Sequence, residues 1–108
     1  MITIEDIKKW SKPHPLANVI SLKDRRGGRV SRFGNKEIEF SIVGGGQGLY
    51  GDFDKTFEVA IFDRKSNDFV TRFFYPETFQ DVIGWMSADD VEKLVNSVIK
   101  REDLSVER

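Results

Sequence analysis

The clearest pattern of apolar and polar positions lies in the middle of the chain. Residues 38–42 alternate between apolar and polar side chains, as a half-buried antiparallel strand requires. Residues 57–61 repeat this alternation. Residues 64–67 then form a polar turn, and residues 69–75 are predicted to be a third strand, with Arg72 facing solvent. Because the connections are short, we predict an antiparallel meander that ends at Tyr75 and Pro76.

Apolar residues at helical spacing predict a short helix at the N-terminus. Thr3 is placed to cap this helix, with Asp6 at the third helical position. Ile7 and Trp10 share one face of the helix. Pro13 lacks a backbone donor and disfavours helical geometry in the residue before it, so the helix should end there.

The best-specified element is a C-terminal helix from Ser87 to Arg101. Ser87 and Asp90 have the spacing of a capping box. Five apolar residues recur at helical spacing and form one stripe: Val91, Leu94, Val95, Val98 and Ile99. This stripe predicts a helix that packs on the sheet. The polar residues 102–108 are expected to fray.

Together these patterns predict one α+β domain over residues 1–108. It has an antiparallel sheet of three to five strands, a C-terminal helix packed on one face and a short N-terminal helix. A further strand is predicted at Leu16–Leu22. The chain has no cysteine, which excludes disulfides and thiolate chemistry. We see no secretory signal and no apolar run near the ~20 residues of a membrane span, so we expect a cytoplasmic protein without membrane contact.

Positive charge is concentrated in one segment, Lys23–Lys36. The whole chain carries 17 Lys and Arg against 18 Asp and Glu, a net charge of −1. Six basic residues and one acidic residue give the segment +5, which leaves −6 for the rest. Gly27 and Gly28 predict a turn at its centre, so we expect a hairpin tip or a mobile loop. The candidate nucleic-acid contacts are four arginines and one aromatic ring that could stack on a base: Arg25, Arg26, Arg29, Arg32 and Phe33.

A glycine-rich loop, Gly44–Gly51, follows the first central strand. Gly46, Gly48 and Gly51 have the G-x-G-x-x-G spacing of dinucleotide-binding loops, but a strand follows in place of the required helix. This context favours a plain connection between strands and predicts no cofactor. A small-ligand or nucleotide site in residues 44–54 stays open as an alternative.

Tyr50 gives this loop a second interpretation. It either lies exposed as a contact residue or folds back onto the core together with Leu49. The residues we expect to contact a partner are Gly48, Leu49, Tyr50, Gly51 and Asp52.

Catalytic and metal-binding groups are sparse. Asp52 and Asp54, with Glu58 nearby, could hold a hard cation, but the calcium-loop register is absent and solvated turn residues are the favoured interpretation. His14 is the one histidine and lies between two prolines, away from any local cluster. We therefore predict no catalytic residue and no metal site.

Three segments of the C-terminal half occur together in a known group. They are Gly48-Leu-Tyr-Gly51, Phe57-Glu-Val-Ala-Ile61, and Asp81-Val-Ile-Gly-Trp-Met-Ser87 followed by Asp90-Val91. This combination resembles a group of small uncharacterised proteins encoded by tailed bacteriophages. In that group a glycine-aromatic loop and a similar strand precede a turn that leads into a terminal helix. The resemblance implies a phage origin and the host cytoplasm, but it does not point to any particular reaction.

The function expected from these features is that of a small non-enzymatic binding protein, a phage accessory factor that contacts a host protein. It follows from the small size, the sparse catalytic chemistry, the resemblance and an excess of aromatic residues. Two alternatives from other classes stay open. One is contact with nucleic acid through residues 23–36, and the other is a small ligand or nucleotide at residues 44–54.

Overall fold

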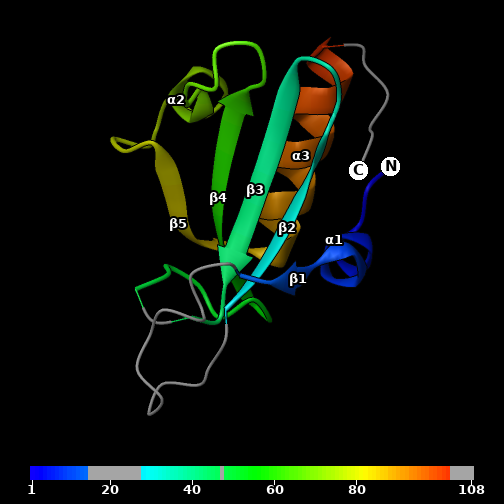
Figure 1. The fold of residues 1–108 in the computed structure, drawn as a ribbon, viewed down its shortest axis with the longest axis vertical. Coiled ribbons are helices and arrows are strands. Elements are labelled where there is room, and N and C mark those ends of the chain that lie inside the picture. The colour runs from blue at the N-terminus through cyan, green and yellow to red at the C-terminus, as the bar shows by residue number, and fades with distance from the viewer. Residues whose placement is uncertain (15–27, 47, 103–108) are drawn as a thin grey trace.

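The structure, a computed structural model, describes residues 1–14, 28–46 and 48–102. Within them, five strands form one antiparallel sheet in sequence order, from β1 at one edge to β5 at the other (Figure 1). The elements are α1 Ile4–Trp10, β1 Lys12–Pro13, β2 Arg29–Gly34, β3 Ile38–Gly44, β4 Thr56–Asp63, α2 Thr71–Phe74, β5 Val82–Ser87 and α3 Ala88–Glu102. The predicted α+β meander with a helix at each end is confirmed. No helix in this part of the chain is long and apolar enough to cross a membrane.

The core lies between the sheet and α3, which covers one face of it (Figure 1). Four residues of the stripe predicted on this helix are buried and Ile99 is half-buried; Val91 and Val95 are fully inaccessible to solvent. Its N-terminal cap is also as predicted, because the Asp90 N–H donates to Ser87 Oγ at 3.2 Å. The sheet contributes alternate residues of its central strands, including the fully buried Phe40 and Phe57.

The predicted N-terminal helix is present and docks on α3. Thr3 and Asp6 form a reciprocal capping box, and these hydrogen bonds from Thr3 lower the pKa of the Asp6 carboxyl. The side chain of Asn96 binds both backbone groups of Ile2, accepting from the N–H at 2.9 Å and donating to the carbonyl at 2.8 Å. The start of the chain is therefore held against α3 by directed bonds as well as by packing.

The predicted third strand over residues 69–75 is wrong. Only Phe69 pairs with β4, by a single bridge to Phe62, and the chain then turns into the short helix α2. The reason lies in Thr71, which is fully buried. Its hydroxyl accepts from the Ile61 N–H at 2.9 Å and donates to the Asp81 carbonyl at 2.6 Å, so a side chain takes the place of the next backbone pairing.

The sheet does not end at Tyr75 and Pro76 as predicted, because β5 follows and pairs with β4. The segment that was expected to be a turn around Gly84 is thus a strand. The other predicted strand, Leu16–Leu22, lies outside the described residues, as do residues 103–108 of the expected frayed tail.

The basic segment is also corrected. Within its second half, Arg29–Gly34 forms β2 in register with β3, and only the last two residues of the segment, Asn35 and Lys36, lie in a hairpin turn. In this turn the buried Asn35 side chain accepts from the N–H groups of Glu37 and Ile38 at 2.8 and 2.9 Å. Of the two glycines expected at the turn, Gly28 immediately precedes β2 and Gly27 lies outside the described residues.

Within the part of the chain that the structure describes, one buried polar side chain lacks a hydrogen-bond partner and gives a test of the packing. Ser31 of β2 is fully buried opposite Ile42, and among the described residues its hydroxyl has no hydrogen-bond partner. Because an unpaired buried hydroxyl costs about 1–3 kcal/mol, we expect Ser31→Ala to raise the free energy of unfolding by about 1 kcal/mol in urea denaturation. Ser41→Ala, at a half-buried position of β3, should change it by less than about 0.5 kcal/mol. A loss of stability in Ser31→Ala would contradict this account.

Candidate functional site

Two exposed aromatic residues from separate sequence motifs meet at the β5 edge of the sheet. The ring centroids of Tyr50 and Trp85 are 6.3 Å apart. Tyr50 is 45% and Trp85 64% exposed. Of the two interpretations of Tyr50, the structure supports exposure, although the ring rests on its neighbours in β5 and not in open solvent.

Backbone hydrogen bonds hold this aromatic pair in place. The Trp85 N–H donates to the Tyr50 carbonyl at 2.7 Å. The Tyr50 N–H donates to the Glu58 carboxylate on β4 at 3.1 Å. The glycine-rich loop is therefore attached to β4 and to the edge strand β5 at the residue that presents its aromatic ring, which reduces the entropy lost when a partner binds.

An irregularity in β5 brings Trp85 to this position. Phe57 pairs with Met86 and Val59 with Ile83, so Gly84 and Trp85 together oppose Glu58 in a β-bulge. Trp85 has a φ of 55°, a left-handed conformation that is unfavourable for a bulky side chain. Strain of this kind is about 1–3 kcal/mol and is found preferentially at functional sites.

Gly84 allows Tyr50 to pack there. A Cβ atom on Gly84 would lie 2.9 Å from the Cβ of Tyr50, which is too close for any other residue without a shift. Gly84 in β5 thus leaves room for Tyr50 of the glycine-rich loop. The sequence does not predict this contact, because the residues are distant along the chain.

A pocket of about 510 Å³ lies beside this pair, between β5 and the segment that precedes it. We use the name aromatic surface for its four ring-bearing residues, Tyr50, Tyr75, Phe79 and Trp85. The Phe79 side chain is 94% exposed. Sequence reasoning found only Tyr50 of these four; the available signal for Phe79 and Trp85 was the excess of aromatic residues over what a small core can bury.

The five predicted contact residues do not all reach the surface. Tyr50 and Asp52 are exposed, and so is Gly48, at a positive φ of 81°. Leu49 is half-buried, and Gly51 is buried and has no side chain to present. The loop joins β3 to β4 directly, as expected for a connection between strands.

Asp52 organises the turn that follows the loop. Its carboxylate accepts from the N–H groups of Thr56, Asp54 and Lys55 at 2.9–3.0 Å, and these bonds hold its pKa well below the usual range. The Asp54 carboxylate pairs with Lys8 at 3.4 Å, while Glu58 binds Tyr50. The three carboxylates considered for a cation thus have separate structural roles. Within the described residues no acidic or histidine cluster could hold a metal ion.

The Asp52 turn predicts a defined response to acid. Folding lowers the pKa of the Asp52 carboxyl, so its charged form stabilises the folded protein at pH values above the unfolded-state pKa of about 4. This contribution is lost as the pH falls toward the pKa of the folded state. We expect Asp52→Asn to lower stability at pH 7 and to reduce the loss of stability between pH 7 and pH 3, measured by urea unfolding. Equal profiles for wild type and Asp52→Asn would contradict this role.

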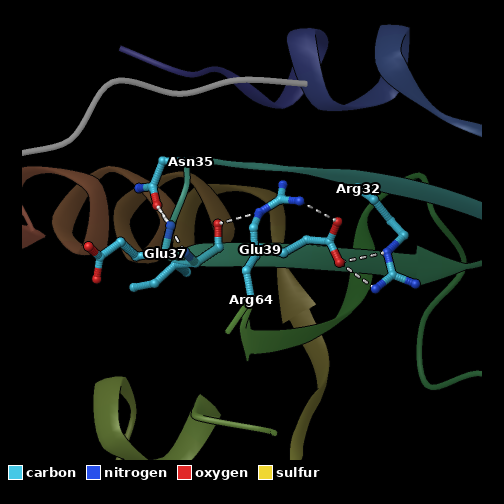
Figure 2. A network of polar contacts seen from close by, with 6 residues as sticks. Arg32, Asn35, Glu37, Glu39 and Arg64 are labelled. Carbon is cyan, nitrogen blue, oxygen red and sulfur yellow. Dashed lines mark hydrogen bonds and ion pairs between the residues drawn. The ribbon is translucent and has the colours of Figure 1, made fainter. Parts of the chain in front are cut away.

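Arg32, one of the two β2 arginines proposed for nucleic acid, already has partners within the protein (Figure 2). Arg32 Nε donates to Glu39 Oε1 at 3.1 Å, and its guanidinium lies 5.4 Å from the centre of the Phe62 ring. Arg64 approaches the other oxygen of Glu39 at 3.4 Å. The single Glu39 carboxylate pairs with both guanidinium groups, so a phosphate at this site would compete with Glu39 for their N–H groups.

The remaining residues of this candidate are dispersed. Phe33 is fully buried and stacks on Phe40 with ring centroids 5.2 Å apart, so the prediction that it stacks on a base is wrong. Arg29 is exposed and donates to the side chain and carbonyl of Ser11 at 2.7 and 2.8 Å. Arg25 and Arg26 lie outside the described residues.

Comparison with known proteins provides no family for this chain. No family model, no curated protein sequence and no solved structure matches it. Its function therefore has to be inferred from its own residues.

Proposed function

We propose that this chain is a small non-enzymatic binding protein that contacts a host protein through the aromatic surface. Following the resemblance of its C-terminal half, we also propose that it is an accessory factor of a tailed bacteriophage that acts in the host cytoplasm.

The observation that carries the proposal is the exposed pair of Tyr50 and Trp85, held by backbone hydrogen bonds. Tyrosine and tryptophan are enriched among the residues that dominate binding energy at protein interfaces. Their rings offer a large contact area with few rotatable bonds, so little entropy is lost on binding. The two segments that carry Tyr50 and Trp85 are also the ones that carry the resemblance.

The test is capture of a bacterial host protein by the immobilised full chain, followed by titration of the purified partner. We expect Tyr50→Ala to weaken this binding by tenfold or more, the loss of about 2 kcal/mol typical of a central aromatic residue. Trp85→Gly should have a similar effect. Glycine is chosen because it tolerates the positive φ at this position, so the bulge is kept while the ring is lost.

Phe69→Ala is the matched control. Phe69 is also 45% exposed, but its ring packs on Phe62, with centroids 4.5 Å apart, and does not line the pocket. Its replacement should leave the affinity for the partner unchanged. Equal binding by wild type, Tyr50→Ala and Trp85→Gly would show that the aromatic surface is not the contact site.

A further inference from the structure

The pocket beside β5 combines aromatic rings with a single charged group. Besides the four residues of the aromatic surface it is lined by Glu77, and no Lys or Arg is among its lining residues. The faces of aromatic rings carry negative electrostatic potential and attract cations, and a nearby carboxylate adds to this attraction. The pocket thus favours a positively charged group.

The surroundings leave the charge of Glu77 unbalanced. Within the described residues, no basic group lies within ion-pair distance of its carboxylate. The sequence from Phe73 to Glu92 contains five acidic residues and no Lys or Arg. Arg72, just before this stretch, pairs with Asp81 at 3.8 Å and does not line the pocket.

A neighbouring hollow toward α3 differs because a basic residue is among its lining residues. It shares Tyr75 and Glu77 with the pocket but is also lined by Asp90 and Lys93. An incoming cation would meet the Lys93 ammonium there. The β5 side is therefore the side where the carboxylate and the aromatic rings act together.

The wall of the pocket is held by its own hydrogen bonds. Thr78 Oγ1 donates to the Val82 carbonyl at 2.9 Å and accepts from the Gln80 N–H at 3.3 Å. These bonds attach the segment that carries Glu77 to the start of β5. On the opposite side, Tyr50 and Trp85 are joined through their backbones. The groups that would bind a cation thus lie on segments with defined positions.

We propose that this pocket binds an arginine side chain of the partner protein, an inference that rests on the function proposed above. Arginine suits the pocket better than lysine. Its planar guanidinium can stack on an aromatic ring while it donates to a carboxylate, and it is less strongly hydrated than an ammonium group.

The experiment is an NMR titration of the full chain, in which the indole N–H signals of the two tryptophans are observed. The probe is a short glycine–serine peptide with one central arginine, compared with the same peptide carrying citrulline, its neutral isostere, or lysine. We expect the arginine peptide to shift the Trp85 signal saturably, with roughly tenfold weaker binding for citrulline. Trp10 lies on α1 at the opposite edge of the sheet and serves as the internal control.

A pair of acidic variants tests the role of the carboxylate. Glu77→Gln should weaken binding of the arginine peptide by roughly three- to fivefold, while Asp81→Asn, which does not line the pocket, should change it by less than about twofold. Both residues are exposed, so the melting temperatures of these variants should stay close to that of the wild type.

The outcomes separate this inference from the proposed function. No shift of Trp85, equal affinity for the citrulline peptide, tighter binding of the lysine peptide or an equal effect of the two acidic variants would overturn the assignment of arginine. Loss of host-protein capture by Tyr50→Ala is scored independently of the peptides. Binding of the arginine peptide without any host-protein contact would contradict the proposed function and leave only the preference of the pocket for arginine.

Discussion

Replacing Leu94 with alanine is expected to lower the free energy of unfolding by about 2–5 kcal/mol. Leu94 is 7% exposed and belongs to the core cluster between α3 and the sheet. The substitution removes apolar contacts and leaves a cavity that the surrounding side chains can fill only in part. Because domains of this size have a total stability of about 5–15 kcal/mol, the variant should lose a large share of it.

Urea denaturation followed by circular dichroism measures this loss. Lys93→Ala is the control, because Lys93 is exposed on the same helix and alanine is a good helix former. It should change stability by less than about 0.5 kcal/mol. A midpoint for Leu94→Ala equal to that of the control would mean that α3 is not docked as described.

A substitution in the β2–β3 hairpin, Gly34→Ala, is expected to have the second large effect. A Cβ atom on Gly34 would lie 2.0 Å from the carbonyl oxygen of Ile38 and 2.9 Å from the Cα of Glu39. Both are backbone atoms, so the clash cannot be relieved by rotating a side chain. The same carbonyl accepts from the Asn35 N–H at 2.9 Å, and a shift would weaken the hairpin turn as well. We expect a loss of about 1–3 kcal/mol or more.

Gly48→Ala separates this clash from simple backbone strain. Gly48 has a positive φ of 81°, but nothing lies within 4 Å of an added Cβ. Its replacement should cost about 1–2 kcal/mol, the ordinary cost of a left-handed conformation. Thermal and urea unfolding of the two variants give the comparison. A smaller loss in Gly34→Ala than in Gly48→Ala would show that the hairpin relaxes more easily than its contacts indicate.

The candidate site was only partly predictable. Tyr50 was identified because an aromatic residue between glycines indicates a contact loop, a local signal. Trp85 and Phe79 come from segments about thirty residues further along the chain and reach Tyr50 only through the sheet. The pairing of Arg32 with Glu39 likewise depends on how β2 and β3 lie side by side. The sequence alone therefore does not show that this arginine of the basic segment already has a hydrogen-bond partner within the sheet.

By itself the sequence determined both terminal helices, the strands β3 and β4 and the meander. These elements follow from caps and periodicities that act within a few residues, where side chains and their own backbone decide the structure. Tertiary structure decided the rest. The hydrogen bonds of the Thr71 hydroxyl take the place of a strand pairing and lead into α2. A bulge at Gly84 and Trp85 interrupts the alternation of inward-facing and outward-facing residues in β5. In both cases the deciding contact joins residues distant in sequence, and its energy outweighs local propensity only once the chain has folded.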